Sequence, residues 1–162
     1  MFIRTIAAAS AALLLAVPVT AHHDGEAARD AGIVVSHAYT VEAGATAHSI
    51  NVFVTIENTN KTPAVLTAAE VDFAEPGVFQ APSVDQSGKM SIQEITALEI
   101  APSQTLTMQP GGIHIVFHDV QEHVEAGDHF HAHLEFEGVG EIEIEVEVEH
   151  SDDEHYHEES VG

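Results

Sequence analysis

The stretch Gln109-Pro110-Gly111-Gly112-Ile113-His114-Ile115-Val116-Phe117-His118 decides the fold, because a turn ends in it and a strand begins. Pro-Gly-Gly is strong turn chemistry, since proline presets one backbone angle and glycine tolerates the others. The residues after the turn alternate, so His114 and His118 lie on one face of the predicted strand, with Ile115 and Phe117 on the other. We therefore expect a rigid turn that presents His114 at the start of a strand.

A histidine in that position suits metal binding. Neutral imidazole offers a nitrogen lone pair to transition-metal ions, and a rigid turn reduces the reorganisation that binding requires. His114 is the first candidate metal ligand, and the alternative is an ordinary half-exposed histidine. The chain has 13 histidines, which cluster near its start, between 114 and 133, and between 150 and 157. Clustered histidine among carboxylates is typical of divalent metal binding.

Apolar residues alternate with polar ones from Ile33 to Glu149, which predicts a series of short strands. Clusters of proline, glycine and asparagine separate the runs. We expect strands at 33–41, 49–57, 64–71, 78–81, 90–98, 105–108, 128–137 and 141–149. Short strands at this spacing predict an all-β antiparallel sandwich.

The last two of these strands are the most clearly patterned pair. Gly138-Val139-Gly140 joins them and predicts a hairpin with Val139 at its apex. With that apex, histidines and glutamates alternate along one solvent face and meet across the strands as His133–Glu145, His131–Glu147 and His129–Glu149. Cross-strand neighbours lie ~5 Å apart, which brings imidazole close to carboxylate. His129, His131 and His133 are therefore candidates for zinc or Cu(II) binding, and the alternative is that they only relieve repulsion among the acids.

Both ends of the chain differ in composition from the middle. Residues 1–21 have the basic start, the apolar run and the small-residue cleavage site of a secretory signal peptide. The apolar run is too short to cross a bilayer, so we expect a periplasmic or secreted protein without a membrane anchor. We expect 22–32 to be a flexible arm, 33–149 one domain, and 150–162 a disordered tail rich in histidine and acid. If cleavage follows residue 21, the new amino group and the imidazole of His22 can chelate Cu(II) together.

Charge and cysteine content restrict the partners. Four basic residues against 27 acidic ones give a formal charge of −23, which repels nucleic acid and attracts cations, although an acidic surface also suits a salty medium. The chain has no cysteine, so disulfides, thiolate metal sites and lipid attachment through cysteine are excluded within these residues. Metal ions are the expected partners.

From Ile33 to Glu149 the sequence resembles the periplasmic copper chaperones of the PCu(A)C type. The likeness rests on three stretches: Val52-Phe53-Val54-Thr55-Ile56-Glu57-Asn58, residues 100–114 with Pro-Gly-Gly-Ile-His at their end, and residues 125–136. The resemblance implies a cupredoxin-like or immunoglobulin-like antiparallel β-sandwich. It also implies a carrier that takes Cu(I) to a receiving protein such as a cytochrome oxidase subunit.

The family's copper site resembles a histidine, a methionine about ten residues later, a histidine after the Gly-Gly turn and a methionine two residues beyond. Here His114 matches the second histidine and Met90 matches the first methionine. Phe79 or Gln80 stands at the first histidine position, and Val116 at the last methionine.

Two of the four ligand positions of the PCu(A)C copper site are therefore replaced in this sequence. Two further residues are candidates to complete the site. These are Met108, just before the turn, and His118, which lies four residues after His114 on the same strand face. Thioethers select Cu(I), so a chain with three methionines and 13 histidines favours Cu(II) or zinc.

The leading hypothesis is an exported copper-binding chaperone or metal carrier. We expect no enzymatic activity, because no nucleophile constellation and no glycine-rich phosphate loop is recognisable. One alternative is a copper redox protein that uses the mature N-terminal His22. Another is a β-sandwich interaction module whose primary site has decayed and whose histidines buffer zinc or Cu(II).

Overall fold

A computed structural model describes residues 27–151, which form eleven strands and no helix. None of these residues belongs to a helix that could cross a membrane. The strands are β1 (Ala28–Asp30), β2 (Ile33–Val41), β3 (Ser49–Asn58), β4 (Ala64–Glu70), β5 (Val78–Val84), β6 (Met90–Ile95), β7 (Leu98–Ile100), β8 (Thr105–Thr107), β9 (His114–His118), β10 (His129–Phe136) and β11 (Gly140–Glu149).

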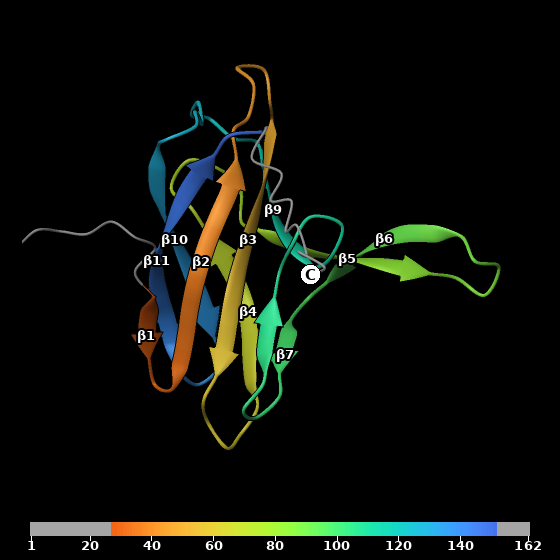
Figure 1. Ribbon diagram of the computed structural model, residues 1–162, viewed down its shortest axis with the longest axis vertical. Helices are drawn as coiled ribbons and strands as arrows, with labels where there is room; N and C mark the ends of the chain where they lie inside the picture. The colour runs from red at the N-terminus through yellow and green to blue at the C-terminus, as the bar shows by residue number, and fades with distance from the viewer. Residues whose placement is uncertain (1–26, 152–162) are drawn as a thin grey trace, which may run out of the picture.

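The strands hydrogen-bond in the order β6-β5-β9-β3-β2-β11-β10-β4-β7, with β1 beside β2 and β8 beside β3. The sheet curls over so that β4 and β7 lie behind β3 (Figure 1), and β3 contacts β7 directly. This arrangement confirms the predicted all-β sandwich. One pair, β11 with β2, is parallel, whereas the other pairs are antiparallel. Parallel neighbours are possible there because β2 and β11 are far apart in the chain and need no tight turn.

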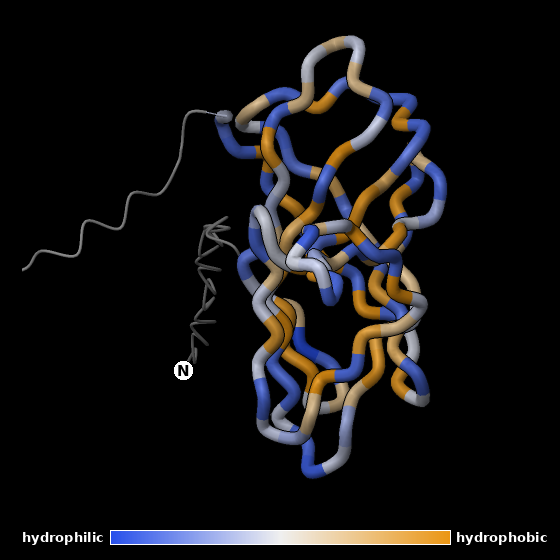
Figure 2. Tube along the Cα trace, turned by 90° about the vertical axis from the view of Figure 1, so that its right-hand side faces the viewer, coloured by the Kyte–Doolittle hydropathy of each residue, from blue (hydrophilic) through white to orange (hydrophobic). Residues whose placement is uncertain are grey.

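The core lies between the two layers and is built from the alternating apolar positions. Figure 2 shows hydrophobic and hydrophilic residues alternating along the strands. Ile115 and Phe117 of β9 are fully buried, as the alternation after the turn predicts. The even positions of β10 and β11 are buried as well, from Ala132 to Phe136 and from Ile142 to Val148. The face that carries His114 is therefore opposite the core, and we call it the outer face.

The hairpin between β10 and β11 differs from the prediction in register. Phe136 pairs with Gly140, so the turn is centred on Gly138 and the predicted apex at Val139 is wrong. Gly138 has a φ of 74°, a conformation that glycine adopts without strain, and the amide of Val139 donates to the carbonyl of Phe136 at 3.1 Å. A shift of two positions leaves every side chain on its predicted face. The directly opposite pairs become His129–Glu147, His131–Glu145 and His133–Glu143.

The beginning of the described chain is more ordered than the sequence indicates. Residues 28–30, which the composition places in a flexible arm of 22–32, form β1 and pair with residues 33–35. Ala31 and Gly32 make the tight turn with φ values of 43° and 80°. The polar composition concealed this strand because its stability comes from pairing with β2 and not from its own apolar pattern.

The end of the described chain is also held in place. The backbone amide and the hydroxyl of Ser151 donate to Oε1 of Glu42 at 3.2 and 3.0 Å. These hydrogen bonds, the backbone one first, lower the pKa of the exposed Glu42 carboxyl. His150 and Ser151 thus contact the domain, although the sequence assigns them to the tail. The predicted signal peptide, the rest of the predicted arm and residues 152–162 lie outside the described part of the chain.

Candidate metal centre

The Pro-Gly-Gly turn positions the first residue of β9 through its own backbone. The amide of Gly112 donates to the carbonyl of Gln109 at 2.9 Å, and the amide of Gln109 donates to the carbonyl of Ile113 at 3.2 Å. Gly111 has a φ of 76°, which favours glycine at that place. The turn therefore closes directly in front of His114.

The turn also orients the imidazole ring of His114. Its Nδ1 lies 2.9 Å from the carbonyl oxygen of Gly112. A carbonyl oxygen only accepts hydrogen bonds, so Nδ1 carries a proton, and in the neutral imidazole Nε2 then keeps the lone pair. A backbone carbonyl that holds one ring nitrogen in this way is the usual outer partner of a metal-binding histidine. The half-buried His114 side chain is thus prepared to offer Nε2 to a cation.

Two side chains flank His114 on the outer face. Gln80 of β5 is its direct cross-strand partner, and Glu94 of β6 lies directly opposite Gln80. On the other side the ring of Phe53 has its centroid 6.1 Å from that of His114, at an interplanar angle of 47°. Gln80 therefore occupies the place where a second ligand from β5 would sit. Phe79, the other residue aligned with the family's first histidine, is buried in the core.

An aromatic strip continues from Phe53 across the outer face. The centroid of the Tyr39 ring lies 5.0 Å from that of Phe53, and the His37 ring lies 4.9 Å from that of Tyr39. His37 has a φ of 49° where the register between β2 and β3 shifts. Burial, and to a smaller extent the charge of Glu149, raises the pKa of the Tyr39 hydroxyl. The strip shields one side of His114 from water.

The raised pKa of Tyr39 predicts a measurable ionisation. The neutral phenol is favoured in the folded protein, so its contribution to stability is full below the ordinary pKa of 10.0 and is lost as pH rises through the higher folded value. Alkaline absorbance titration of the wild type minus that of the Tyr39→Phe variant isolates this group, because the chain has only two tyrosines. We expect a midpoint above 10.0. A midpoint at or below that value would contradict the burial of this ring.

The other sequence-predicted ligands are not gathered around His114. Met108 is 2% exposed and packs in the core, where its amide donates to the carbonyl of Val54. Met90 is 69% exposed and pairs with Val84 near the end of the β5–β6 hairpin, which projects from the body in Figure 1. It lies two strands across from His114 and four positions further out than Gln80, or ~13 Å along the strand.

The projecting hairpin was not predicted in this form. The sequence indicates a loop from residue 82 to residue 89, whereas β5 continues to Val84 and turns at Asp85. The carboxylate of Asp85 accepts hydrogen bonds from Ser87 and from the amide of Lys89 at 2.6 to 3.0 Å, which lowers the pKa of Asp85. This Asx-type turn carries Met90 away from His114.

The remaining predicted ligands that the structure describes lie at two other places. His118 is exposed at the far end of β9, opposite Ser49 and ~13 Å from His114 along the strand. The side chains of His129, His131 and His133 lie on the outer face of β10, which β11, β2 and β3 separate from β9. His22 lies outside the described residues.

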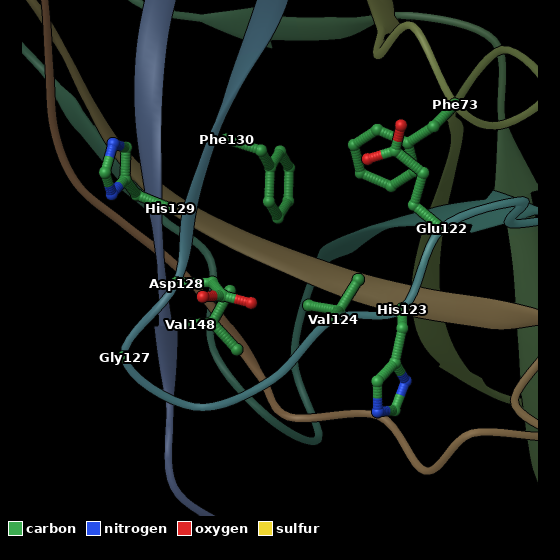
Figure 3. Close-up of a pocket in the computed structure, with 9 residues that line it drawn as sticks. All are labelled: Phe73, Glu122, His123, Val124, Gly127, Asp128, His129, Phe130 and Val148. Atoms are coloured by element: carbon green, nitrogen blue, oxygen red, sulfur yellow. The ribbon is translucent and has the colours of Figure 1, made fainter.

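A pocket of about 240 Å³ near the start of β10 combines histidines with carboxylates, but these groups do not converge. In Figure 3 the Asp128 carboxylate projects toward the pocket, whereas His129 points to the other side of its strand and His123 turns away. Nε2 of His123 instead lies 3.0 Å from Oε1 of Glu125. Between residues 27 and 151, no three histidine, aspartate or glutamate side chains are already placed to enclose a metal ion.

Sequence reasoning missed three features of the centre around His114. The Gly112 carbonyl, the Phe53 ring and the Gln80 amide all become its neighbours through the turn and through strand pairing. Of these three, only Gln80 could have been found from the sequence, because it is one of two residues aligned with the first histidine of the PCu(A)C copper site.

The family model described as putative lipoprotein LpqE-like matches residues 33–148, which is most of the described chain. The chain belongs to this LpqE-like family. No curated protein matches the chain significantly. The matched span runs from the start of β2 into β11 and includes the His114 turn.

Solved structures place the fold of this LpqE-like protein among PCuAC domains. The apo PCuAC domain from PmoF1 has a TM-score of 0.68 at 22% identity, covering 77% of this chain and 99% of that one. The copper-bound PCuAC domain from PmoF2 has a TM-score of 0.67 at 19% identity, covering 77% and 98%. Cu(I)-bound DR1885 from Deinococcus radiodurans has a TM-score of 0.56 at 17% identity, covering 69% and 74%. The resemblance to the PCu(A)C type is confirmed for the fold.

Proposed function

We propose that this LpqE-like protein is a copper carrier that binds its ion through Nε2 of His114. The observation that carries the proposal is the hydrogen bond from Nδ1 of His114 to the Gly112 carbonyl, which leaves Nε2 as a pre-oriented donor. The fold supports copper as the cargo, since two structures that share it are described as copper-bound or Cu(I)-bound. The protein acts by binding and releasing the ion, and not by turning over a substrate.

The neighbours of His114 favour a hard or borderline ion. The amide of Gln80 and, further out, the carboxylate of Glu94 offer oxygen. Met108 is buried in the core, and Met90 reaches the ion only if the β5–β6 hairpin bends toward the sheet. Imidazole with oxygen donors suits Cu(II), with zinc as the competitor, whereas the Cu(I) of the PCu(A)C type would need that bending.

Release to another protein fits the incomplete ligand set. The donors come from one side, because Val116 stands where the PCu(A)C type has its second methionine and Phe53 covers a neighbouring position. A receiving protein can therefore supply the missing ligands and take the ion. A cytochrome oxidase subunit is the receiver that the PCu(A)C resemblance implies, and the family description together with the predicted signal peptide supports transfer in the periplasm or outside the cell.

The test compares two histidine variants of the full chain. Copper(II) is titrated against a competing chelator, and the affinity of the tightest equivalent is measured for wild type, His114→Ala and His118→Ala. We expect His114→Ala to weaken that equivalent by at least the ~10–100-fold that follows from losing even an outer partner of a ligand. His118→Ala is the matched control, since it removes an exposed histidine from the same strand face.

The same titration with Cu(I) and with zinc tests which ion the centre prefers. A Met90→Leu variant that weakens Cu(I) but not Cu(II) would show that the hairpin bends toward His114. If His114→Ala binds all three ions as tightly as the wild type, His114 is not the ligand and the likeness to copper-binding domains is one of fold alone.

A further inference from the structure

A second group of imidazoles lies on the outer face of β4, β10 and β11, and it consists of His131, His133 and the glutamates around them. His133 has Glu143 directly opposite on β11 and Glu70 directly opposite on β4. These three strands contain no lysine and no arginine. No cationic side chain of these strands therefore neutralises the carboxylates, and the surface attracts small cations.

The contacts within this group are close. Nδ1 of His131 lies 3.3 Å from Oε1 of Glu143, and Nδ1 of His133 lies 3.0 Å from Oε1 of Glu141. Both contacts run diagonally across the β10–β11 pair, because each histidine contacts the glutamate two residues before its directly opposite partner. Glu143 therefore lies beside both histidines, opposite one and in contact with the other.

One atom of the group is unusual. Nδ1 of His133 is buried from solvent and forms no hydrogen bond within residues 27–151, but Oε1 of Glu141 lies 3.0 Å away from it. Buried polar atoms in native proteins almost always have a partner, which is protein, water or an ion. Nδ1 of His133 therefore has a carboxylate as its polar neighbour, within a surface that favours cations.

We propose that His131, His133 and Glu143 bind one divalent transition-metal ion, with zinc as the reference ion. Histidines two positions apart on one strand face have Cα atoms roughly 7 Å apart, a span that two imidazoles close around an ion at about 2.0–2.1 Å from each nitrogen. The carboxylate of Glu143 supplies the third ligand from the neighbouring strand. Water completes the tetrahedron.

Binding requires side-chain rotation but no change of the backbone. The three groups do not yet enclose a point, but the side chains of His131 and Glu143 are 58% and 61% exposed, so solvent leaves them room to rotate. Fixing such mobile side chains around the ion costs conformational entropy, which a preformed site has already lost on folding. The zinc affinity is therefore lower than that of a rigid centre.

This site is separate from the proposed copper centre and does not depend on it. Four strand spacings of ~4.8 Å, or roughly 19 Å along the sheet, lie between β9 and β10. Measuring zinc in a His114→Ala background therefore removes the proposed copper ligand from the measurement, and the two proposals can fail independently.

The experiment uses the full chain with His114→Ala and zinc ions alone as the probe. Ring nitrogen resonances of all histidines are followed by NMR during the titration. We expect the ring nitrogens of both His131 and His133 to shift at the first added equivalent. Adding Glu143→Gln, which keeps the shape but removes the charge, should weaken zinc at these rings about tenfold or more.

The matched control is Glu57→Gln, which removes one exposed acidic charge from β3 and should leave the zinc affinity of these rings unchanged. His131→Ala is a second variant that should abolish the response of His133. The proposal is overturned if zinc shifts only the histidines between 150 and 157, or if Glu143→Gln and Glu57→Gln bind zinc equally well at the two β10 rings.

Discussion

Phe117→Ala should lower the free energy of unfolding by about 3–5 kcal/mol, the usual cost of truncating a buried phenylalanine. Phe117 is fully buried near the end of β9, and its ring packs so closely on the backbone before β5 that a Cβ at Gly77 would lie 3.0 Å from it. The space that the ring leaves cannot collapse, because β9 is paired on both sides with β3 and β5. Urea unfolding followed by circular dichroism measures the loss.

The control for this prediction is the next residue. His118→Ala removes a side chain of the same strand that is exposed, and we expect a change within about 0.5 kcal/mol. Similar losses for the two variants would mean that β9 does not hold the core as described. The strand that presents His114 would then have to be placed differently.

Asn58→Ala should lower the free energy of unfolding by about 2–4 kcal/mol, because it leaves one buried and several partly buried backbone groups without this partner. Asn58 is completely buried at the end of β3. Its Nδ2 donates to the carbonyls of Thr62 at 2.9 Å and Ile100 at 3.0 Å, and its Oδ1 accepts from the amide of Asn60 at 3.0 Å. The side chain thus ties the β3–β4 turn to β7, where the two layers of the sheet meet.

Asn60→Ala is the comparison for this second variant. The side-chain amide of Asn60 is exposed, and its Nδ2 donates a hydrogen bond to the carbonyl of Ala31 at 2.8 Å. We expect a cost of about 1 kcal/mol or less. Chemical denaturation of both variants decides the question, and a loss below about 1 kcal/mol for Asn58→Ala would show that the layers do not depend on this hydrogen-bond hub.

The faces of the strands could be predicted from the sequence because side chains alternate with a period of two residues. Ile115 and Phe117 were expected inside and His118 outside, and the structure agrees. The Pro-Gly-Gly turn and the position of His114 at the start of β9 were also predictable, since turn chemistry acts over only four residues. The all-β fold follows from the same short-range signals.

Alternation does not determine which residues lie opposite one another. The β10–β11 register moved by two positions because Gly138, and not Val139, takes the centre of the turn, and a shift of two preserves every face. The pattern therefore predicted His133 on the outer face but paired it with Glu145, whereas the structure pairs it with Glu143. That difference decides which carboxylate joins the proposed zinc site.

The sequence by itself determined the all-β class, the faces of the strands and the prominence of His114. Only the tertiary structure decided its neighbours: Gln80 beside it, Met108 in the core and Met90 out on the hairpin. The physical reason is range. Turn and alternation preferences act between residues that are adjacent in the chain, whereas the surroundings of a ligand depend on strand order and register, which are set by packing between segments 30 or more residues apart, as for His114 and Gln80.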